Sequence, residues 1–108
     1  MDQHATLYQL LLEIEAEMRA RSLWSATQPS AAALHSSQPF CIDTLSFWEW
    51  TQWLMLPRFE QIVELKQRLP QGSNITPMAE EAAQNTKIKS DKLVEYFSAL
   101  DQLLSTQN

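Results

Sequence analysis

Apolar residues recur at helical spacing near the start of the chain. They occupy positions i, i+3, i+4, i+7 and i+11, at Leu7, Leu10, Leu11, Ile14 and Met18. Acidic and basic side chains fill many of the positions between them. The pattern predicts an amphipathic helix from Asp2 to about Ser22. Trp24 follows the end of this helix, and we expect it to fold back against the core.

Small and polar residues interrupted by prolines come next, from position 25 to 38. This composition predicts a loop with one helical turn at Ala31 to Leu34. A loop of this length is unusual in a compact domain. Because Leu34 and Phe40 offer apolar side chains to bury, we expect an ordered loop that lies along the helices.

Aromatic residues are concentrated in the segment Pro39 to Phe59, which holds three of the four tryptophans and three of the four phenylalanines. Ser46 and Glu49 have the spacing of a capping box, which predicts a helix start. The helix predicted from Phe47 to Leu56 is apolar around most of its circumference, with Glu49 and Gln52 on its polar side. Such a helix is usually buried. We therefore expect it to be the centre of the fold.

Three more helical patterns follow, separated by turn-forming residues. The first runs from Pro57 to Leu69, and Pro57 is expected either to kink the preceding helix or to start a new one. The second is short, with Thr76 as its N-cap and an end near Asn85. The last spans about 91 to 105 and is capped by the residue at position 90 or 91.

No segment alternates with the two-residue period of a β-strand. The sequence therefore predicts an all-α fold, a bundle of four main helices plus one short helix, with a long ordered loop after the first helix. With 108 residues, the chain has room for one domain, 1–108, and can bury a core without disulfides or a metal.

The charge balance is acidic, with 8 basic and 13 acidic residues and a net charge of -5. Such a chain repels phosphate backbones, so we expect no direct binding to nucleic acid; its one basic cluster is Lys87, Lys89 and Lys92. A single cysteine forms no internal disulfide, and the first residues have the pattern of neither a signal peptide nor a membrane span. These features favour a cytoplasmic protein.

Few side chains in this sequence offer chemistry. His4, His35 and Cys41 lack the spacing of metal ligands, so the sequence predicts neither a metal site nor a cofactor. Cys41 as a nucleophile with His35 as its base would lack an orienting group and an oxyanion site. We interpret Cys41 as a packed thiol beside an exposed imidazole, and we expect no catalytic residues.

Six residues around the aromatic helix form a candidate binding or structural cluster: Asp43, Trp48, Glu49, Trp50, Trp53 and Arg58. Trp50 and Trp53 lie about 60° apart on an α-helix, which favours them as a core pair. Trp48 lies far round the helix and is the better candidate for a partly exposed groove lining. This geometry disfavours a platform on which all three rings stack against a base, a sugar or a proline-rich peptide.

The charged members of this cluster have two interpretations. In the structural one, Asp43 caps a turn, Glu49 completes the capping box and Arg58 bridges the corner at Pro57 to the loop. A carboxylate held beside a guanidinium also serves in binding sites, so a functional role stays open. The structural interpretation is favoured.

Three sequence runs, QPFCIDT, EWTQW and LPRF, resemble the motif of the YqcC-like family of small bacterial proteins. The residues that carry the resemblance form a spaced set: Asp43, Trp50, Trp53, Pro57 and Arg58. Thr51 stands where the family usually has an apolar residue; if it is buried, its hydroxyl is expected to bond a carbonyl one turn back. The resemblance covers the whole chain. It implies an all-helical domain with no assigned activity, often encoded beside a tRNA pseudouridine synthase.

Three functions follow from these observations. The leading one is a non-catalytic interaction module that binds another protein through an apolar groove near Trp48, Met55 and the long loop. The alternative is an accessory factor of a tRNA-modifying enzyme, with a pseudouridine synthase as the first candidate partner. A small enzyme ranks third, because no nucleophile, base and oxyanion donor can be assembled from the chain.

Overall fold

The computed structural model describes residues 2–87 and 91–105, and these ranges contain helices and no strand. The helices are, in chain order, α1 (Gln3–Ala20), α2 (Ala31–Leu34), α3 (Phe47–Trp50), α4 (Leu56–Glu64), α5 (Thr76–Asn85) and α6 (Asp91–Ser105). A single 3-10 turn, η1, spans Pro39–Cys41, and a π-helical segment, η2, spans Thr51–Met55. The all-α class predicted from the sequence is confirmed.

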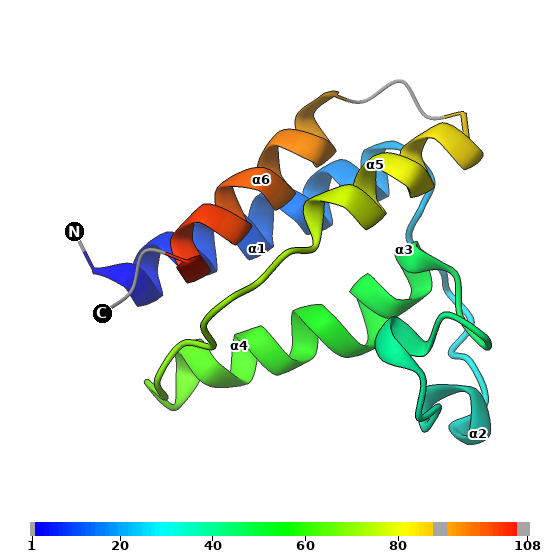
Figure 1. Ribbon diagram of the computed structural model, residues 1–108, viewed down its shortest axis with the longest axis horizontal. Helices are drawn as coiled ribbons and strands as arrows, with labels where there is room; N and C mark the ends of the chain where they lie inside the picture. The colour runs from blue at the N-terminus through cyan, green and yellow to red at the C-terminus, as the bar shows by residue number, and fades with distance from the viewer. Residues whose placement is uncertain (1, 88–90, 106–108) are drawn as a thin grey trace.

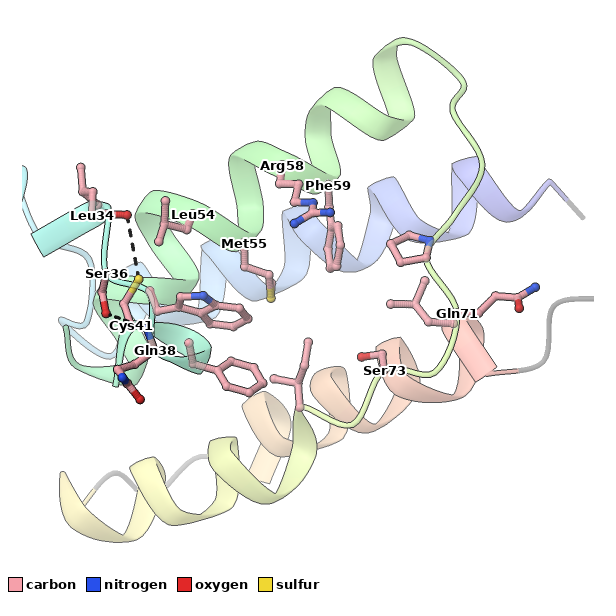
Figure 2. Close-up of a pocket in the computed structure, with 15 residues that line it drawn as sticks. Leu34, Ser36, Gln38, Cys41, Leu54, Met55, Arg58, Phe59, Gln71 and Ser73 are labelled. Atoms are coloured by element: carbon pink, nitrogen blue, oxygen red, sulfur yellow. Dashed lines mark hydrogen bonds between the residues drawn. The ribbon is translucent and has the colours of Figure 1, made fainter. Parts of the chain in front are cut away.

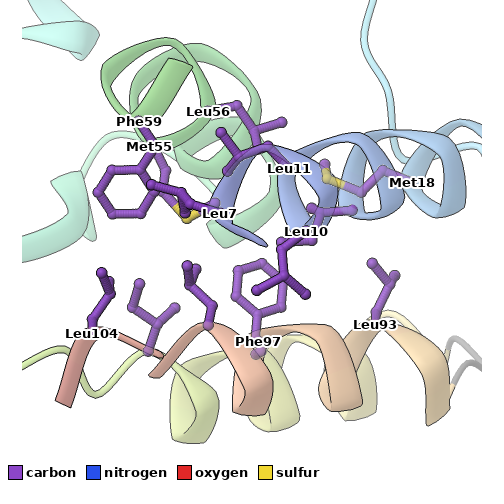
Figure 3. Close-up of a cluster of buried hydrophobic side chains, with 14 of the residues drawn as sticks. Leu7, Leu10, Leu11, Met18, Met55, Leu56, Phe59, Leu93, Phe97 and Leu104 are labelled. Atoms are coloured by element: carbon purple, nitrogen blue, oxygen red, sulfur yellow. The ribbon is translucent and has the colours of Figure 1, made fainter. Parts of the chain in front are cut away.

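Helix α1 is the element around which the main helices are packed, because it contacts both α4 and α6 (Figure 1). Helix α5 packs on α6, and α3 contacts α5. Neighbouring long helices run antiparallel (Figure 1). The core lies between α1, α4 and α6, where Leu11 and Leu56 lie on one side and Phe97 on the other (Figure 3).

The burial of α1 follows its sequence pattern. The five residues at helical spacing are all in the core: Leu7, Leu10, Leu11, Ile14 and Met18. Asp2 caps the helix by accepting a hydrogen bond from the His4 N–H at 3.0 Å. Trp24 folds back and packs against the core, as predicted, with the Arg19 guanidinium 4.5 Å from its ring centroid.

The two helices predicted on either side of Pro57 form one continuous helical run, α3–η2–α4, from Phe47 to Glu64. The run passes Pro57 because η2 is wound more loosely: the Leu56 N–H donates to the Thr51 carbonyl, five residues back. We attribute this π-helical winding to Pro57, which has no N–H and crowds the carbonyl four residues earlier. The side chain of Thr51 is fully buried and donates to the Phe47 carbonyl at 3.0 Å, as predicted.

Helix α4 ends at Glu64, whereas the sequence pattern predicted an end near Leu69. Lys66 adopts a left-handed conformation with φ of 51°. The Lys66 N–H donates to the Val63 carbonyl at 3.3 Å, and the Gln67 N–H donates to the Ile62 carbonyl at 3.0 Å. These two bonds form a Schellman cap. The prediction was wrong because a lysine occupies the position where such caps usually show a glycine.

The start of α5 is capped from another helix. Thr76 was predicted as the N-cap, but it is the first helical residue, and Ile75 precedes the helix. The Asp101 carboxylate of α6 accepts the N–H groups of Ile75 and Thr76 at 2.9 and 2.8 Å. It also accepts the hydroxyls of Ser73 and Thr76, each at 2.6 Å. One α6 side chain thus holds both the connection before α5 and the start of α5.

Two hydrogen bonds from Gln52 join the long loop to the helical run, although the sequence pattern placed Gln52 on the polar side of the helix. Gln52 is buried, and its amide both accepts from the Ser25 N–H and donates to the Ser25 carbonyl, each at 2.8 Å. These two hydrogen bonds satisfy the buried amide and offset the cost of removing it from water. The predicted helical turn at Ala31–Leu34 is present as α2.

Candidate functional site

The three tryptophans of the helical run face differently from the prediction. Trp48 is buried, with 4% of its surface exposed, whereas Trp50 and Trp53 are only partly buried. The reason is that the helical run continues through Pro57, so the apolar stripe of α4 extends backwards from Phe59 through Met55 to Trp48. Two separate helices would have allowed Trp50 and Trp53 to face the core and Trp48 to be partly exposed.

The helical run also borders a groove of about 570 Å³. Figure 2 shows this groove between α4 on one side and α5 and α6 on the other, with the η1 region and the segment 70–75 at its two ends. The residues that line it are Leu34, Ser36, Gln38, Phe40, Cys41, Trp50, Leu54, Met55, Arg58, Phe59, Pro70, Gln71, Ser73, Ile75 and Leu104.

The groove explains why the aromatic helix has apolar residues on most of its surface. That pattern predicted a buried helix at the centre of the fold, but α1 holds the central position. Trp50 and Leu54 are only partly buried and line the groove. Part of the apolar surface of these two side chains is therefore not buried in the core. An apolar hollow with a few polar groups at its edges is the usual form of a binding site.

Arg58 is the cationic residue of the groove, and it has no carboxylate partner. It is exposed on α4, beside Phe59. No hydrogen bond or ion pair joins its guanidinium to any described residue. By contrast, Arg19 and Arg21 on α1 pair with Glu15 and Glu17 at 3.0 and 2.8 Å. No aspartate or glutamate is among the residues that line the groove.

The negative charge nearest in sequence to Arg58 lies on α4 at Glu60. Burial raises the pKa of this carboxyl, and repulsion from the Glu15 carboxylate of α1 raises it further. Glu15 and Glu60 therefore belong to an acidic surface at the seam of α1 and α4, and neither lines the groove. Arg58 thus lies at the groove, whereas Glu15 and Glu60 lie at the seam of α1 and α4.

The backbone at the loop end of the groove is strained. Phe40 and Cys41 are consecutive non-glycine residues in the left-handed region, with φ of 57° and 48°. Each such residue costs on the order of 1–3 kcal/mol. The conformation is held by the Phe40 ring, whose centroid is 4.7 Å from that of Trp50, and by the Leu45 N–H, which donates to the Cys41 carbonyl at 2.8 Å. Strain of this kind is common where a fold shapes a site.

The structure separates the six candidate residues. Trp50 and Arg58 lie together in the groove, whereas Trp48 lies in the core and also borders a smaller hollow of about 230 Å³ between α3 and α5. Glu49 completes the capping box, since the Ser46 N–H donates to its carboxylate at 2.9 Å. Asp43 is exposed and accepts from the Ser36 hydroxyl at 2.5 Å. Neither acid pairs with Arg58.

Trp53 shares one property with Trp48. The indole Nε1 of each ring is buried and has no hydrogen-bond partner among the described residues. An unsatisfied buried N–H is costly, so both rings are held in place by packing.

Other residues of the site were not predicted from the sequence. They include Phe40, Leu54, Gln38 and Gln71, which come from segments that only the fold brings together. The sequence had indicated a groove near Met55 and the long loop, and both line it, but Trp48, which was predicted there too, does not. The strained η1 turn left no signal, because neither Phe40 nor Cys41 is a residue type that favours positive φ.

The residues considered for chemistry each make separate local contacts. Cys41 is buried and its Sγ lies 3.9 Å from the Leu34 carbonyl, while the His35 ring bonds the Ala31 carbonyl at 2.7 Å. No group of three or more His, Cys, Asp or Glu side chains within 2–87 and 91–105 is placed to hold a metal ion. Of the basic cluster, Lys87 and Lys92 are exposed and Lys89 lies outside the described residues. No helix in the described ranges is long and apolar enough to span a bilayer.

Three relatives show how this chain compares with known proteins. An uncharacterised protein of Haemophilus influenzae is 35% identical over 97 residues, which cover 90% of this chain and 81% of that protein. The uncharacterised protein YqcC of Escherichia coli is 29% identical over 105 residues, covering 97% and 96%. A protein of Pectobacterium carotovorum named tRNA pseudouridine synthase C is 32% identical over 72 residues, which are 67% of this chain and 19% of that protein.

The fold also has a counterpart among solved structures. The solution NMR structure of YqcC from Escherichia coli matches with a TM-score of 0.85 and 28% sequence identity, over 100% of this chain and 92% of that one. The model of the DUF446 family, described as tRNA pseudouridine synthase C, matches residues 6–103. This chain therefore belongs to the DUF446 family of YqcC-like proteins.

Proposed function

We propose that this protein is a non-catalytic interaction module that acts as an accessory factor of a tRNA pseudouridine synthase. The observation that carries the proposal is the match to the Pectobacterium carotovorum protein of that name. The matched region is 19% of that protein, so about four fifths of it has no counterpart here. We infer that the relative joins a domain like this one to a catalytic part, and that the present domain associates with a catalytic part of the same kind.

Joining two domains in one chain replaces a weak intermolecular contact by an intramolecular one at millimolar effective concentration. Such a fusion is useful when the two parts work on the same substrate or on each other. The family description, which also names the synthase, supports the same partner.

The side chains of this chain support a binding role over catalysis. Base or nucleophile chemistry needs an accessible group with a second group that activates it. The Cys41 thiol is buried, and the Asp101 carboxylate is engaged by four hydrogen bonds. The two relatives that match most of this chain are named as uncharacterised proteins, and their names state no activity.

The charge of the molecule suits such a partner. An enzyme that binds tRNA presents basic surface, and this chain carries a net charge of -5. Complementary charge speeds the encounter of two proteins more than it tightens their complex. The single buried cysteine suits a reducing compartment, so we place the complex in the cytoplasm.

The test is a titration of the purified synthase of the same bacterium with this protein. Calorimetry and size-exclusion chromatography at low and moderate salt should show a complex whose association rate falls as salt rises. Pseudouridine formation in tRNA should change when this protein is added. An absence of heat and of co-elution, together with unchanged modification, would contradict the proposal.

A further inference from the structure

We propose that the groove beside α4 binds a peptide segment of the partner in which bulky apolar side chains flank a carboxylate. The identity of the partner rests on the proposed function. The surface, and the chemistry of what it binds, are argued from the groove itself.

The size and lining of the groove call for apolar side chains. Its volume of about 570 Å³ lies within the range of sites that enclose a small ligand or a few side chains. The helical run lines the groove with Leu54, Met55 and Phe59, and Ile75 and Leu104 line it from the start of α5 and from α6. Most of these side chains are buried in the core and form the floor of the groove, so Leu54 and Trp50 offer the more accessible apolar surface.

The charge of the groove calls for a carboxylate. Arg58 has no partner among the described residues, and no acidic residue lines the groove, although the chain is acidic as a whole. An arginine binds a carboxylate through two parallel hydrogen bonds, which gives the pair a defined geometry. Arg19 and Arg21 are paired with glutamates, whereas Arg68 has no partner among the described residues but does not line the groove.

The two ends of the groove offer groups for a peptide backbone. Gln38 lies at one end and Gln71 at the other (Figure 2). Both are exposed, and no hydrogen bond joins either side-chain amide to the described residues. An amide can donate to a peptide carbonyl and accept from a peptide N–H at the same time. Both amides point outward from the groove (Figure 2), so they would meet an occupant only where it extends past the two ends.

The groove suits a peptide better than a nucleotide. Stacking of a base needs a free aromatic face, but the Trp50 ring is flanked by Phe40 and Phe47, with centroids at 4.7 and 5.8 Å. A nucleic acid also needs several cations for its phosphates, and the groove has Arg58 as its charged lining residue.

The experiment compares Arg58→Glu with Arg68→Glu. Both residues are exposed, so neither reversal disturbs the core, and only Arg58 lines the groove. In the synthase titration we expect Arg58→Glu to weaken binding tenfold or more and Arg68→Glu to leave it within about twofold. Equal effects of the two variants, while the wild type still binds, would overturn the groove proposal and leave the proposed function standing.

A second arm does not depend on the synthase. An array of random-sequence peptides is probed with the wild type and with Arg58→Glu, and the selected peptides are mapped onto the protein by NMR. We expect peptides with Asp or Glu between bulky apolar residues, shifts at Leu54 and Gln71, and loss of binding when the acid is changed to its amide. Shifts confined to other surfaces, no enrichment of acidic peptides, or displacement of the peptide by uridine monophosphate would each overturn the proposal.

Discussion

Trp48 and Trp50 are two residues apart on the same helix and lie in opposite environments. Trp48 packs into the core with its indole nitrogen unsatisfied, whereas Trp50 packs between phenylalanines and faces the groove. Trp48 therefore contributes mainly to stability, and Trp50 shapes the groove. It also makes the three tryptophans separable by mutation.

Trp48→Ala is expected to lower the free energy of unfolding by roughly 3–5 kcal/mol, because it empties a large core site. Trp50→Ala and Trp53→Ala should cost less, since both rings are partly exposed. Denaturant midpoints of the three variants, with slopes compared, provide the measurement. A larger loss for either partly exposed ring would show that the facing of the helix is wrong.

The helix ends of this protein follow no simple sequence rule. Ser22, Lys66 and Lys87 hold left-handed conformations just after α1, α4 and α5, with φ of 59°, 51° and 56°. Glycine is the usual residue at such positions, because a Cβ makes the conformation unfavourable. Here the backbone hydrogen bonds of each cap outweigh that cost.

The link between α6 and α5 through Asp101 makes stability depend on pH. Burial raises the pKa of the Asp101 carboxyl, but the hydrogen bonds from Ile75, Ser73 and Thr76 outweigh this and hold the pKa below its ordinary value of 3.8. The unfolded chain therefore binds the proton first as pH falls. The stabilisation is complete above the unfolded pKa and is lost as pH falls through the folded one.

Asp101→Asn is expected to lower stability at pH 7 by at least about 2 kcal/mol, because an amide presents N–H groups to the Thr76 N–H. The gap between wild type and variant should narrow as pH falls below about 4. Urea midpoints measured from pH 7 to pH 3 test this. A gap of constant size over that range would mean that the carboxylate charge does not contribute.

At the scale of the whole molecule, acidic charge and an apolar groove with one arginine occur together. The net charge of -5 resists contact with phosphate backbones, while the groove offers surface to another protein. These two properties are the physical basis for the proposal of a protein partner.

The isolated protein is expected to show no saturable binding to tRNA at concentrations below about 100 μM at physiological salt, since too few basic residues are available to release counterions. Fluorescence anisotropy of labelled tRNA at 50 and 150 mM salt measures this. A basic tRNA-binding domain serves as the positive control. Tight binding that weakens steeply with salt would favour direct action on RNA over the accessory role.

The sequence determined the local parts of this structure. The apolar spacing of 7–18 predicted the buried face of α1, the Ser46–Glu49 pair predicted where α3 begins, and the lack of strand periodicity predicted the fold class. Arg58 and Trp50 were among the candidate site residues because they lie in the aromatic segment. All of these depend on neighbours within one or two helical turns, and such neighbours are visible in sequence.

Tertiary contacts decided the rest. The run through Pro57, which turned Trp48 inward, depends on π-helical winding and on packing against α1. The Asp101 cap joins residues 25 to 28 positions apart. The groove combines the strained η1 turn, the helical run and the segment before α5. Its geometry arises from contacts between distant segments. The energies of these contacts outweigh local preferences, and residue types do not reveal which distant segments meet.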